Sequence, residues 1–493
     1  MKFLSAAILG FCTLSSQTGT SFAFNVPKSL QNRKSTQMAH NLLPHNQSYK
    51  RRHADDFFQV SMASSASTDS SPLSSWSELE SHPSIQKPLQ TPRPIYKDAL
   101  PPEVEASNID KPILYRDANC VCAASQMVWL GLECKNIDYL TVLVEKPFNL
   151  RSDESANRRI ENANDEKNSM IPRIVWPETE SNGDEMKNND KNNQPTSDPI
   201  KLLEQIHSHY PAATPNFYPK LSAAVDASRC NILRFPGVMP RLSDPNFMSH
   251  APLLFRPDGT LVPKSSHCVS LEELEEMLEE YYLGPYLCGK DVTAADVAWI
   301  PYLERYAVQL PMVYPNVDVL NPRSSDAYGE VWKWFLAMER DVPAYACAVM
   351  GDGRLWKRCL EEVVELHNER AATEEEKVTL GPEPKRKGWW MKNNPKGLEL
   401  WKEYAEGRPW LGGTPEWEVA LFLIRNREEI MKECGVDGAD EALREVVQRL
   451  LYGDAGATLS EKACQIVQFV GERVSVPKDL GMVPALALWA ISQ

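Results

Sequence analysis

The residue best placed to do chemistry in this sequence is Cys122. A short apolar run over 113–115 is followed by a polar turn, and a new apolar pattern begins at Ala123, which predicts a strand, a loop and a helix. Cys122 then lies at the start of the helix, where backbone N–H groups and the helix dipole stabilise an anion. Arg116, in the turn, would add positive charge. This arrangement predicts a thiolate that acts as a nucleophile near neutral pH.

The residues after Cys122 give the sequence C-A-A-S, so Ser125 stands where a two-thiol redox site carries its second cysteine. A single thiolate forms and exchanges a mixed disulfide, but it has no partner at this position with which to close an internal one. Cys120, two residues before Cys122, is a candidate second thiol, either resolving or metal-binding. No histidine lies near this pair in the sequence, so no metal site is predicted.

The stretch from Leu114 to Tyr139 resembles the start of the glutathione transferase superfamily, and most of all its long cysteine-type members in photosynthetic organisms, the Iota class. Those members read approximately LYRD-x-x-x-W-C-P-[FY]-C-x-[RK]-V-W-L-x-L-E-x-K-x-I-x-Y. The residues that match without a gap are Leu114, Tyr115, Arg116, Asp117, Cys122, Val128, Trp129, Leu130, Leu132, Glu133, Lys135, Ile137 and Tyr139. At the site the sequence departs, with Val121, Ala123, Ala124 and Ser125 in place of Trp, Pro, an aromatic residue and the second Cys. The resemblance therefore bears more directly on the fold than on the activity.

The resemblance implies an α/β domain followed by all-α domains. A thioredoxin-like, glutathione-binding domain, with a mixed sheet and helices on both faces, is expected over residues 112–210, with a polar insertion at 178–194. A helical transferase domain is expected over 211–370, and a further helical extension over 371–493.

The same resemblance makes glutathione the expected co-substrate. Pro172 matches the cis-proline that opens the third strand of the family's first domain, where the backbone of Ile171 would pair with the peptide part of glutathione. Thr196, Ser197 and Asp198 match the family's E-S-D, with Ser197 at a helix N-terminus that holds the γ-glutamyl carboxylate. Thr196 replaces the usual acid. An ordinary trans proline and a plain helix N-cap are the alternative interpretations of these two motifs.

In the expected second domain, Thr293 and Asp296 have the spacing of a capping box, within a stretch that resembles the superfamily's signature for its central buried helix. The family's pocket for the second substrate lies between the first two domains, so Tyr302, Arg305 and Tyr306 are candidate lining residues. The expected second substrate is a small electrophile or a glutathionylated thiol. Many members pair through the first domain, so the resemblance is also compatible with a homodimer.

Composition and the N-terminal segments bear on partners and location. The net charge of -14 argues against nucleic acid as a general partner. Residues 1–23 have the features of a secretory signal, and residues 24–53 are basic and hydroxyl-rich like a plastid transit segment. Together they predict a plastid location, with a secreted or endomembrane protein as the alternative. The signal is too short to span a bilayer, so no membrane span is expected in the mature chain. Residues 54–111 are rich in Ser and Pro and predict a disordered linker.

Three functions remain open from the sequence. In the first, the Cys122 thiolate removes glutathione from a mixed disulfide or reduces dehydroascorbate, and glutathione resolves the intermediate. In the second, glutathione itself is the nucleophile, and the hydroxyl of Tyr115, near the end of the first strand, stabilises its thiolate. The third is a non-catalytic scaffold that binds glutathione or a protein, which the changes at Ala123, Ala124 and Thr196 favour.

Overall fold

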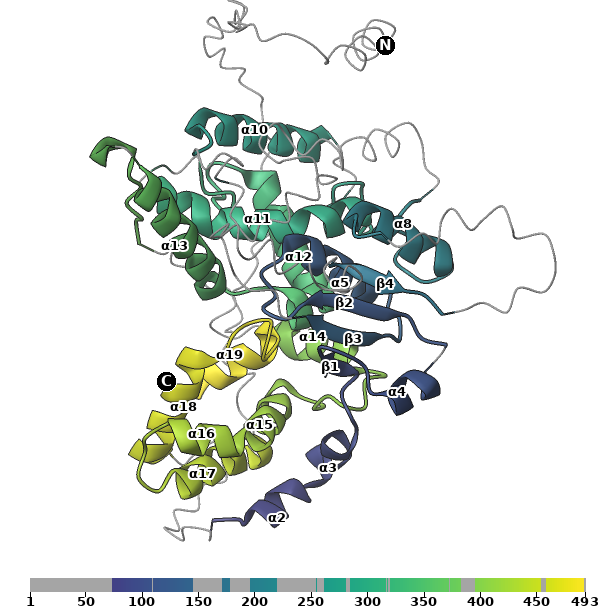
Figure 1. The fold of residues 1–493 in the computed structure, drawn as a ribbon, viewed down its shortest axis with the longest axis vertical. Coiled ribbons are helices and arrows are strands. Elements are labelled where there is room, and N and C mark those ends of the chain that lie inside the picture. The colour runs from purple at the N-terminus through teal and green to yellow at the C-terminus, as the bar shows by residue number, and fades with distance from the viewer. Residues whose placement is uncertain are drawn as a thin grey trace, which may run out of the picture. The chain divides into compact units, whose positions relative to one another are not determined.

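The computed structural model describes residues 73–491 except for 109, 145–170, 178–195, 220–253, 255–260, 281–283, 316, 318–319, 372, 383–394 and 454–457 (Figure 1). The predicted signal and transit segments at 1–53 and the insertion at 178–194 lie outside the described residues, so these assignments and the plastid location stay predictions. Among the helices that the structure describes, none has both the length and the apolar character needed to cross a membrane.

The described strands form one four-stranded mixed sheet. They are β1 (Ile95–Lys97), β2 (Ile113–Asp117), β3 (Leu140–Val144) and β4 (Arg173–Val175), in the order β1-β3-β2-β4. Strands β1 and β2 run parallel to β3, whereas β4 runs antiparallel to β2. Helix α5 (Ala123–Cys134) connects the two central strands, which gives the β-α-β unit typical of parallel neighbours. The predicted thioredoxin-like arrangement is confirmed.

The two faces of the sheet are covered by different helices. Leu114 and Ile174 belong to the main apolar core, which also contains most of α5. Ile113 and Val142, which point the other way, form a separate cluster with Val104 of helix α4 (Pro102–Ser107). Helix α8 (Pro199–His209) packs against α5. Gly131 permits this close approach, because a Cβ at this position would lie 2.6 Å from a side-chain carbon of Leu203.

The second half of the fold is helical, as predicted. Its first helices are α10 (Lys264–Glu280), α11 (Ala294–Val313), α12 (Gly329–Asp341), a π-helical turn η5 (Tyr345–Val349) and α13 (Gly353–Arg370). Helix α11 is buried along nearly its whole length and packs directly on α5. The predicted cap of α11 is present, since Asp296 accepts a hydrogen bond of 2.9 Å from the N–H of Thr293. Asp296 also accepts 2.9 Å and 2.8 Å bonds from Leu287 N and Trp334 Nε1, so this carboxylate joins three segments.

The predicted helical extension is present. After a short 3-10 turn η6 (Glu374–Glu376) it comprises α14 (Pro395–Ala405), α15 (Pro415–Arg425), α16 (Arg427–Glu433), α17 (Ala439–Tyr452), α18 (Glu461–Arg473) and α19 (Met482–Ala490). Glu133 of α5 connects the extension to the first domain. Its carboxylate accepts bonds from Tyr139 Oη at 2.6 Å and Trp129 Nε1 at 3.3 Å, and from Arg408 of the extension at 2.9 Å.

The prediction of a disordered linker over 54–111 is wrong from residue 73 onward. This part contains α2 (Trp76–Glu80) and α3 (Pro83–Gln90) as well as α4 and β1. We call residues 73–93 the strap. Leu79 and Ile85 of the strap are fully buried against α17 and α15, and Figure 1 shows the purple strap helices beside the yellow-green extension. The composition of the strap misled the prediction because its few apolar residues are buried by helices much later in the chain.

Candidate functional site

Cys122 lies where the sequence predicted, at the N-cap of α5 directly after the loop that follows β2. Its sulfur accepts a hydrogen bond of 3.5 Å from the backbone N–H of Ser125. An N–H donor at the first turn of a helix is the environment that stabilises a thiolate. However, Cys122 is only 3% exposed, so the side chain is almost completely closed off from solvent.

Asp117, at the end of β2, shapes the loop that carries Cys122. Its Oδ1 accepts a 3.0 Å bond from Asn119 N, and its Oδ2 accepts bonds of 2.7 Å from Val121 N and 3.1 Å from Cys122 N. Cys120 adopts a left-handed conformation with φ of 59° to complete the turn. A single buried carboxylate therefore accepts three backbone N–H groups of this loop.

Arg305 of α11 holds the same loop from the other side. Its Nη2 donates to the carbonyl of Val121 at 3.0 Å, and its Nη1 donates to Gln126 Oε1 of α5 at 2.7 Å. The guanidinium lies 3.8 Å from the centroid of the Trp356 ring. Burial lowers the pKa of Arg305, and the negative charge of Glu304 opposes that shift. The sequence predicted Arg305 as a lining residue of the pocket for the second substrate. Arg305 is 4% exposed and contacts the residue before Cys122, and its role as a lining residue stays a prediction.

The two predicted lining tyrosines lie at different depths. Tyr302 is 9% exposed, and burial raises the pKa of its phenol. Its electrostatic interaction with Cys122 shows that the two side chains are near one another. Tyr306 lies one turn further along α11 and is 2% exposed, with its ring 5.6 Å from that of His267 in α10. Both phenols are therefore protonated at neutral pH, and Tyr302 is the one close to the sulfur.

Cys120 has a different partner from Cys122. Arg116 Nη1 donates to its sulfur at 3.1 Å, and the same guanidinium lies 4.0 Å from the centroid of the Trp129 ring. Burial raises the pKa of the Cys120 thiol, and Arg116 opposes this only in part. A buried protonated thiol is a poor nucleophile, so this environment does not favour Cys120 as a resolving thiol. That role stays a prediction. Within the described part of the chain, no group of three or more His, Cys, Asp or Glu side chains could hold a metal ion.

The peptide bond between Ile171 and Pro172 is cis, as predicted. In the antiparallel pairing of β4 with β2, Arg173 is opposite Tyr115. The cis bond, one residue earlier, therefore lies beside the end of β2 that leads into the Cys122 loop. The strand register brings these two predicted site features to the same end of the sheet.

The motif at 196–198 acts as a helix cap. Asp198 is the N-cap of α8, and its Oδ1 accepts from Ile200 N at 3.0 Å and from Lys201 N at 3.3 Å. Thr196 Oγ1 in turn accepts a 3.1 Å bond from Asp198 N. Because Asp198 already places a carboxylate at this helix end, the N-cap interpretation holds for it. Ser197 is half-buried between these two capping residues.

Tyr115 lies away from the Cys122 loop. Its ring packs with Ile113 and Val142 on the sheet face opposite α5, and the guanidinium of Arg173 lies 3.9 Å from its centroid. The placement gives no support to Tyr115 as the group that stabilises a glutathione thiolate beside α5.

Comparison with known proteins finds partial likenesses of fold. No protein-family model matches the chain, and no curated protein matches it. The Omega 3C glutathione transferase of Trametes versicolor is 16% identical, with 48% of this chain and 90% of that chain covered and a TM-score of 0.30. A glutathione transferase homolog of Drosophila mojavensis with bound glutathione is 16% identical, with 51% and 97% covered and a TM-score of 0.33. The dehydroascorbate reductase of Chlamydomonas reinhardtii is 14% identical, with 51% and 98% covered and a TM-score of 0.32. Likenesses of this size leave the function to be argued from the site itself.

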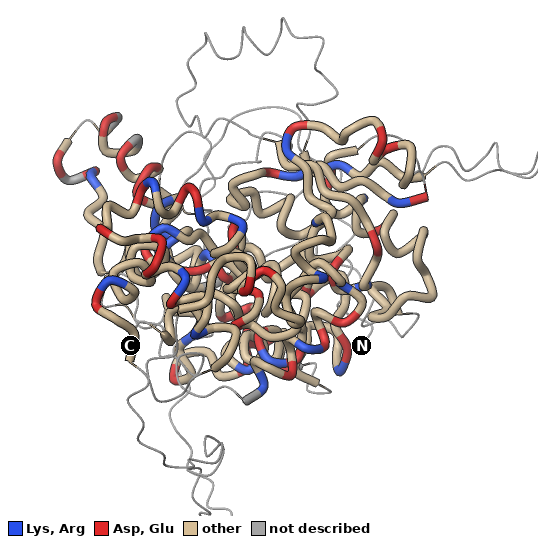
Figure 2. Tube along the Cα trace, turned by 90° about the horizontal axis from the view of Figure 1, so that it is seen from below, with Lys and Arg blue, Asp and Glu red and all other residues tan. Residues whose placement is uncertain are grey.

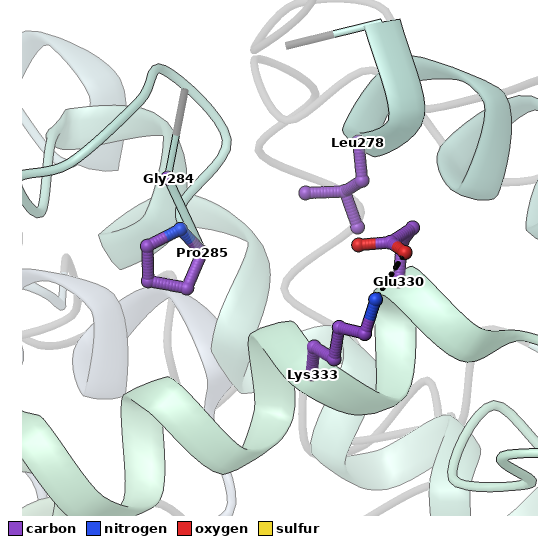
Figure 3. A pocket seen from close by; sticks show the side chains of 5 residues that line it. All are labelled: Leu278, Gly284, Pro285, Glu330 and Lys333. Atoms are coloured by element: carbon purple, nitrogen blue, oxygen red, sulfur yellow. Dashed lines mark hydrogen bonds and ion pairs between the residues drawn. The ribbon is translucent and has the colours of Figure 1, made fainter. Parts of the chain in front are cut away.

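A cavity of about 210 Å³ lies elsewhere, between the end of α10 and the start of α12 (Figure 3). Leu278, Gly284, Pro285, Glu330 and Lys333 line it. Lys333 Nζ is paired with Glu330 Oε1 at 2.5 Å, and the N-terminus of α12 is already capped by Glu275, which accepts from Glu330 N at 2.9 Å. The charged groups of this cavity are therefore satisfied within the chain, and none of the predicted site residues lines it.

Sequence reasoning missed two residues that hold the site together. Gln126 Nε2 donates to Glu304 Oε1 at 2.6 Å and to Val349 O at 3.0 Å, which joins α5 to α11 and η5. Charges of both signs lie interspersed along the described trace (Figure 2). The buried carboxylate of Glu304 accepts a further bond of 2.7 Å from Tyr345 Oη. The adjacent Glu304 and Arg305 in a largely apolar helix were the available signal, because buried charges need partners.

Proposed function

We propose that this protein is a glutathione transferase superfamily member of the long cysteine type, and that it carries out glutathione-dependent thiol transfer through Cys122. The observation that carries the proposal is the register of β4 against β2. It sets the cis Ile171–Pro172 bond beside the strand end that leads to Cys122 at its helix N-cap. This pairing of a nucleophile at a helix start with a cis-proline at the neighbouring strand suits the binding of a thiol peptide.

The reaction proceeds in two exchange steps. The Cys122 thiolate attacks the glutathione sulfur of a glutathionylated substrate, the substrate S–S bond breaks, and the released substrate thiolate takes up a proton. A second glutathione thiolate then attacks the mixed disulfide, which yields glutathione disulfide and restores Cys122. Ser125 has no sulfur, so no internal thiol at that position competes with glutathione for the second step.

The binding contacts follow the same proposal. The backbone of Ile171, before the cis bond, pairs with the peptide part of glutathione. Ser197 binds its γ-glutamyl carboxylate through the hydroxyl. The N–H groups of α8 contribute less than the resemblance implies, because Asp198 already accepts two of them. A small electrophile such as dehydroascorbate is the alternative second substrate.

The burial of Cys122 favours a second candidate, a non-catalytic scaffold on the same fold. At 3% exposure the sulfur is enclosed by the loop and by α11, and a disulfide substrate reaches it only if these elements separate. The scaffold predicts that Cys122 resists alkylation in the folded protein and that the chain is not retained on immobilised glutathione.

The deciding experiment measures the alkylation rate of Cys122 by peptide mass spectrometry, with and without glutathione, together with deglutathionylation activity. The thiol transferase predicts alkylation near neutral pH that glutathione slows, and activity that Cys122→Ser removes and Tyr115→Phe retains. A wild-type chain whose Cys122 is unreactive, and whose activity survives Cys122→Ser, would falsify the assignment.

A further inference from the structure

The peptide unit that joins Val121 to Cys122 is held at both ends by buried charged side chains. Its carbonyl accepts from Arg305 Nη2 at 3.0 Å, and its N–H donates to Asp117 Oδ2 at 3.1 Å. Arg305 is 4% exposed and Asp117 is 1% exposed, so neither bond competes with water. Charge-assisted hydrogen bonds in such surroundings are the stronger kind. We call this pair of contacts the peptide clamp.

The guanidinium of Arg305 is itself fixed on several sides. It lies over the ring of Trp356, and its Nη1 donates to Gln126, which belongs to the first turn of the helix that Cys122 caps. Arg305 therefore contacts the residue before Cys122 and a residue four positions after it. This places a permanent cation against the N-cap at which the sulfur lies.

The groups that face this cation come from several elements. They are Tyr302 and Glu304 on α11, Cys359 on α13, Gln126 on α5 and Cys122 at its N-cap. Glu304 Oε1 is 3.7 Å from Arg305 Nη1, but its carboxylate also accepts bonds from Gln126 Nε2 and Tyr345 Oη. Burial raises the pKa of Cys359 to about 12, so this thiol is neutral. Cys122 is thus the remaining thiol beside Arg305 whose helix position favours an anion.

We propose that Arg305 is the positioning residue for Cys122, because it clamps the Val121–Cys122 peptide and supplies the positive charge that compensates the thiolate. This inference rests on the proposed function, in which Cys122 is the nucleophile. Lysine cannot replace arginine here, since the planar fork reaches Val121 O and Gln126 Oε1 together and an ammonium group does not.

The test is the pH profile of Cys122 alkylation by iodoacetamide, followed by peptide mass spectrometry in the full-length protein. In Arg305→Gln, we expect the midpoint of the profile to move to higher pH by about one unit, which slows alkylation at neutral pH about tenfold. Arg305→Lys keeps the charge and loses the fork, so it should shift the midpoint less and still slow the reaction. A merely structural arginine would alter stability without moving the midpoint.

The matched control is Arg323→Gln. Arg323 is also stacked on an aromatic ring, 4.2 Å from the centroid of Phe335, and also paired with a buried carboxylate, that of Glu339, but it does not contact the Cys122 loop. This variant should keep the wild-type profile. If Arg305→Gln does not fold, Arg305→Lys decides the question, since it preserves the buried charge.

Two outcomes distinguish a failure of the positioning role of Arg305 from a failure of the proposed thiol transferase function. If wild-type Cys122 reacts near neutral pH and both Arg305 variants share its profile, the positioning role is overturned and the proposed function stands. If wild-type Cys122 does not react at any pH and the chain is not retained on glutathione, both are overturned.

Discussion

Two short segments of this molecule are held in place by polar contacts, but the residues that hold them come from different distances along the chain. The Cys122 loop is shaped mainly by Asp117, within five positions, with further bonds from the distant side chains of Arg305 and Lys478. The strap is held by residues 364 positions later in the case of Trp76 and Asp440, and 325 positions later in the case of Arg93 and Glu418. The Cys122 loop positions the proposed nucleophile, and the strap packs on the extension. We therefore expect substitutions in the loop to change activity, and substitutions in the strap to change the free energy of unfolding.

The largest effect expected is on chemistry. Cys122→Ser should reduce deglutathionylation to background, because the proposed mixed disulfide forms on this sulfur, while stability should change little. The measurement is turnover of a glutathionylated peptide. Cys464→Ser, which removes an exposed cysteine of α18, should retain full turnover. Equal losses of turnover in both variants would show that the loss is not specific to the Cys122 sulfur.

The next effect is on the strap. Leu79→Ala should lower the free energy of unfolding by about 3 kcal/mol, because it empties a fully buried site beneath the extension. Urea unfolding measures this, and alkylation of Cys122 in the folded protein should be unchanged. Leu73→Ala, at a residue that is 36% exposed, is the control and should change stability by less than about 0.5 kcal/mol. If the strap does not pack on the extension, Leu79→Ala and Leu73→Ala should change the free energy of unfolding by the same small amount.

Acid should act on the helical half through His267. Burial lowers its pKa from 6.5 to about 4, and neither ring nitrogen has a hydrogen-bond partner among the described residues. Between these two values the unfolded state binds the extra proton, so stability is fully present above about pH 6.5 and falls as the pH decreases toward 4. The loss from this group reaches at most about 3 kcal/mol. Urea unfolding from pH 7 to pH 4 should be less steeply pH-dependent in His267→Leu, and parallel curves would contradict the prediction.

The smallest effect expected is at the edge of the strap. Arg427 and Glu80 form an ion pair whose side chains are 31% and 39% exposed. Arg427→Gln should therefore lower stability by only about 0.5 kcal/mol, and less in high salt. Thermal unfolding at low and high salt measures this. A loss as large as that of Leu79→Ala would mean that the charges, rather than the buried apolar side chains, attach the strap.

The contrast also explains which features could be predicted from the sequence. The strand and helix around Cys122 follow from apolar patterns within a short window, and the cap of α11 follows from Thr293 and Asp296 three positions apart. The cis bond at Pro172 could be predicted only through the resemblance. The strap could not, because nothing near Leu79 indicates the helices that bury it. Nor could the contact of Arg305 with Val121 O, which joins residues 184 positions apart.

The docking of the strap on the extension has a consequence for biosynthesis. The ribosome releases residues 73–93 more than three hundred codons before the helices that bury them. A nascent chain therefore carries these apolar residues without their partners until α15 and α17 have been translated, although domains generally fold from the N-terminus onward. Fragments that end before α15 should accordingly expose the strap to proteases, even where the Cys122 loop has already formed.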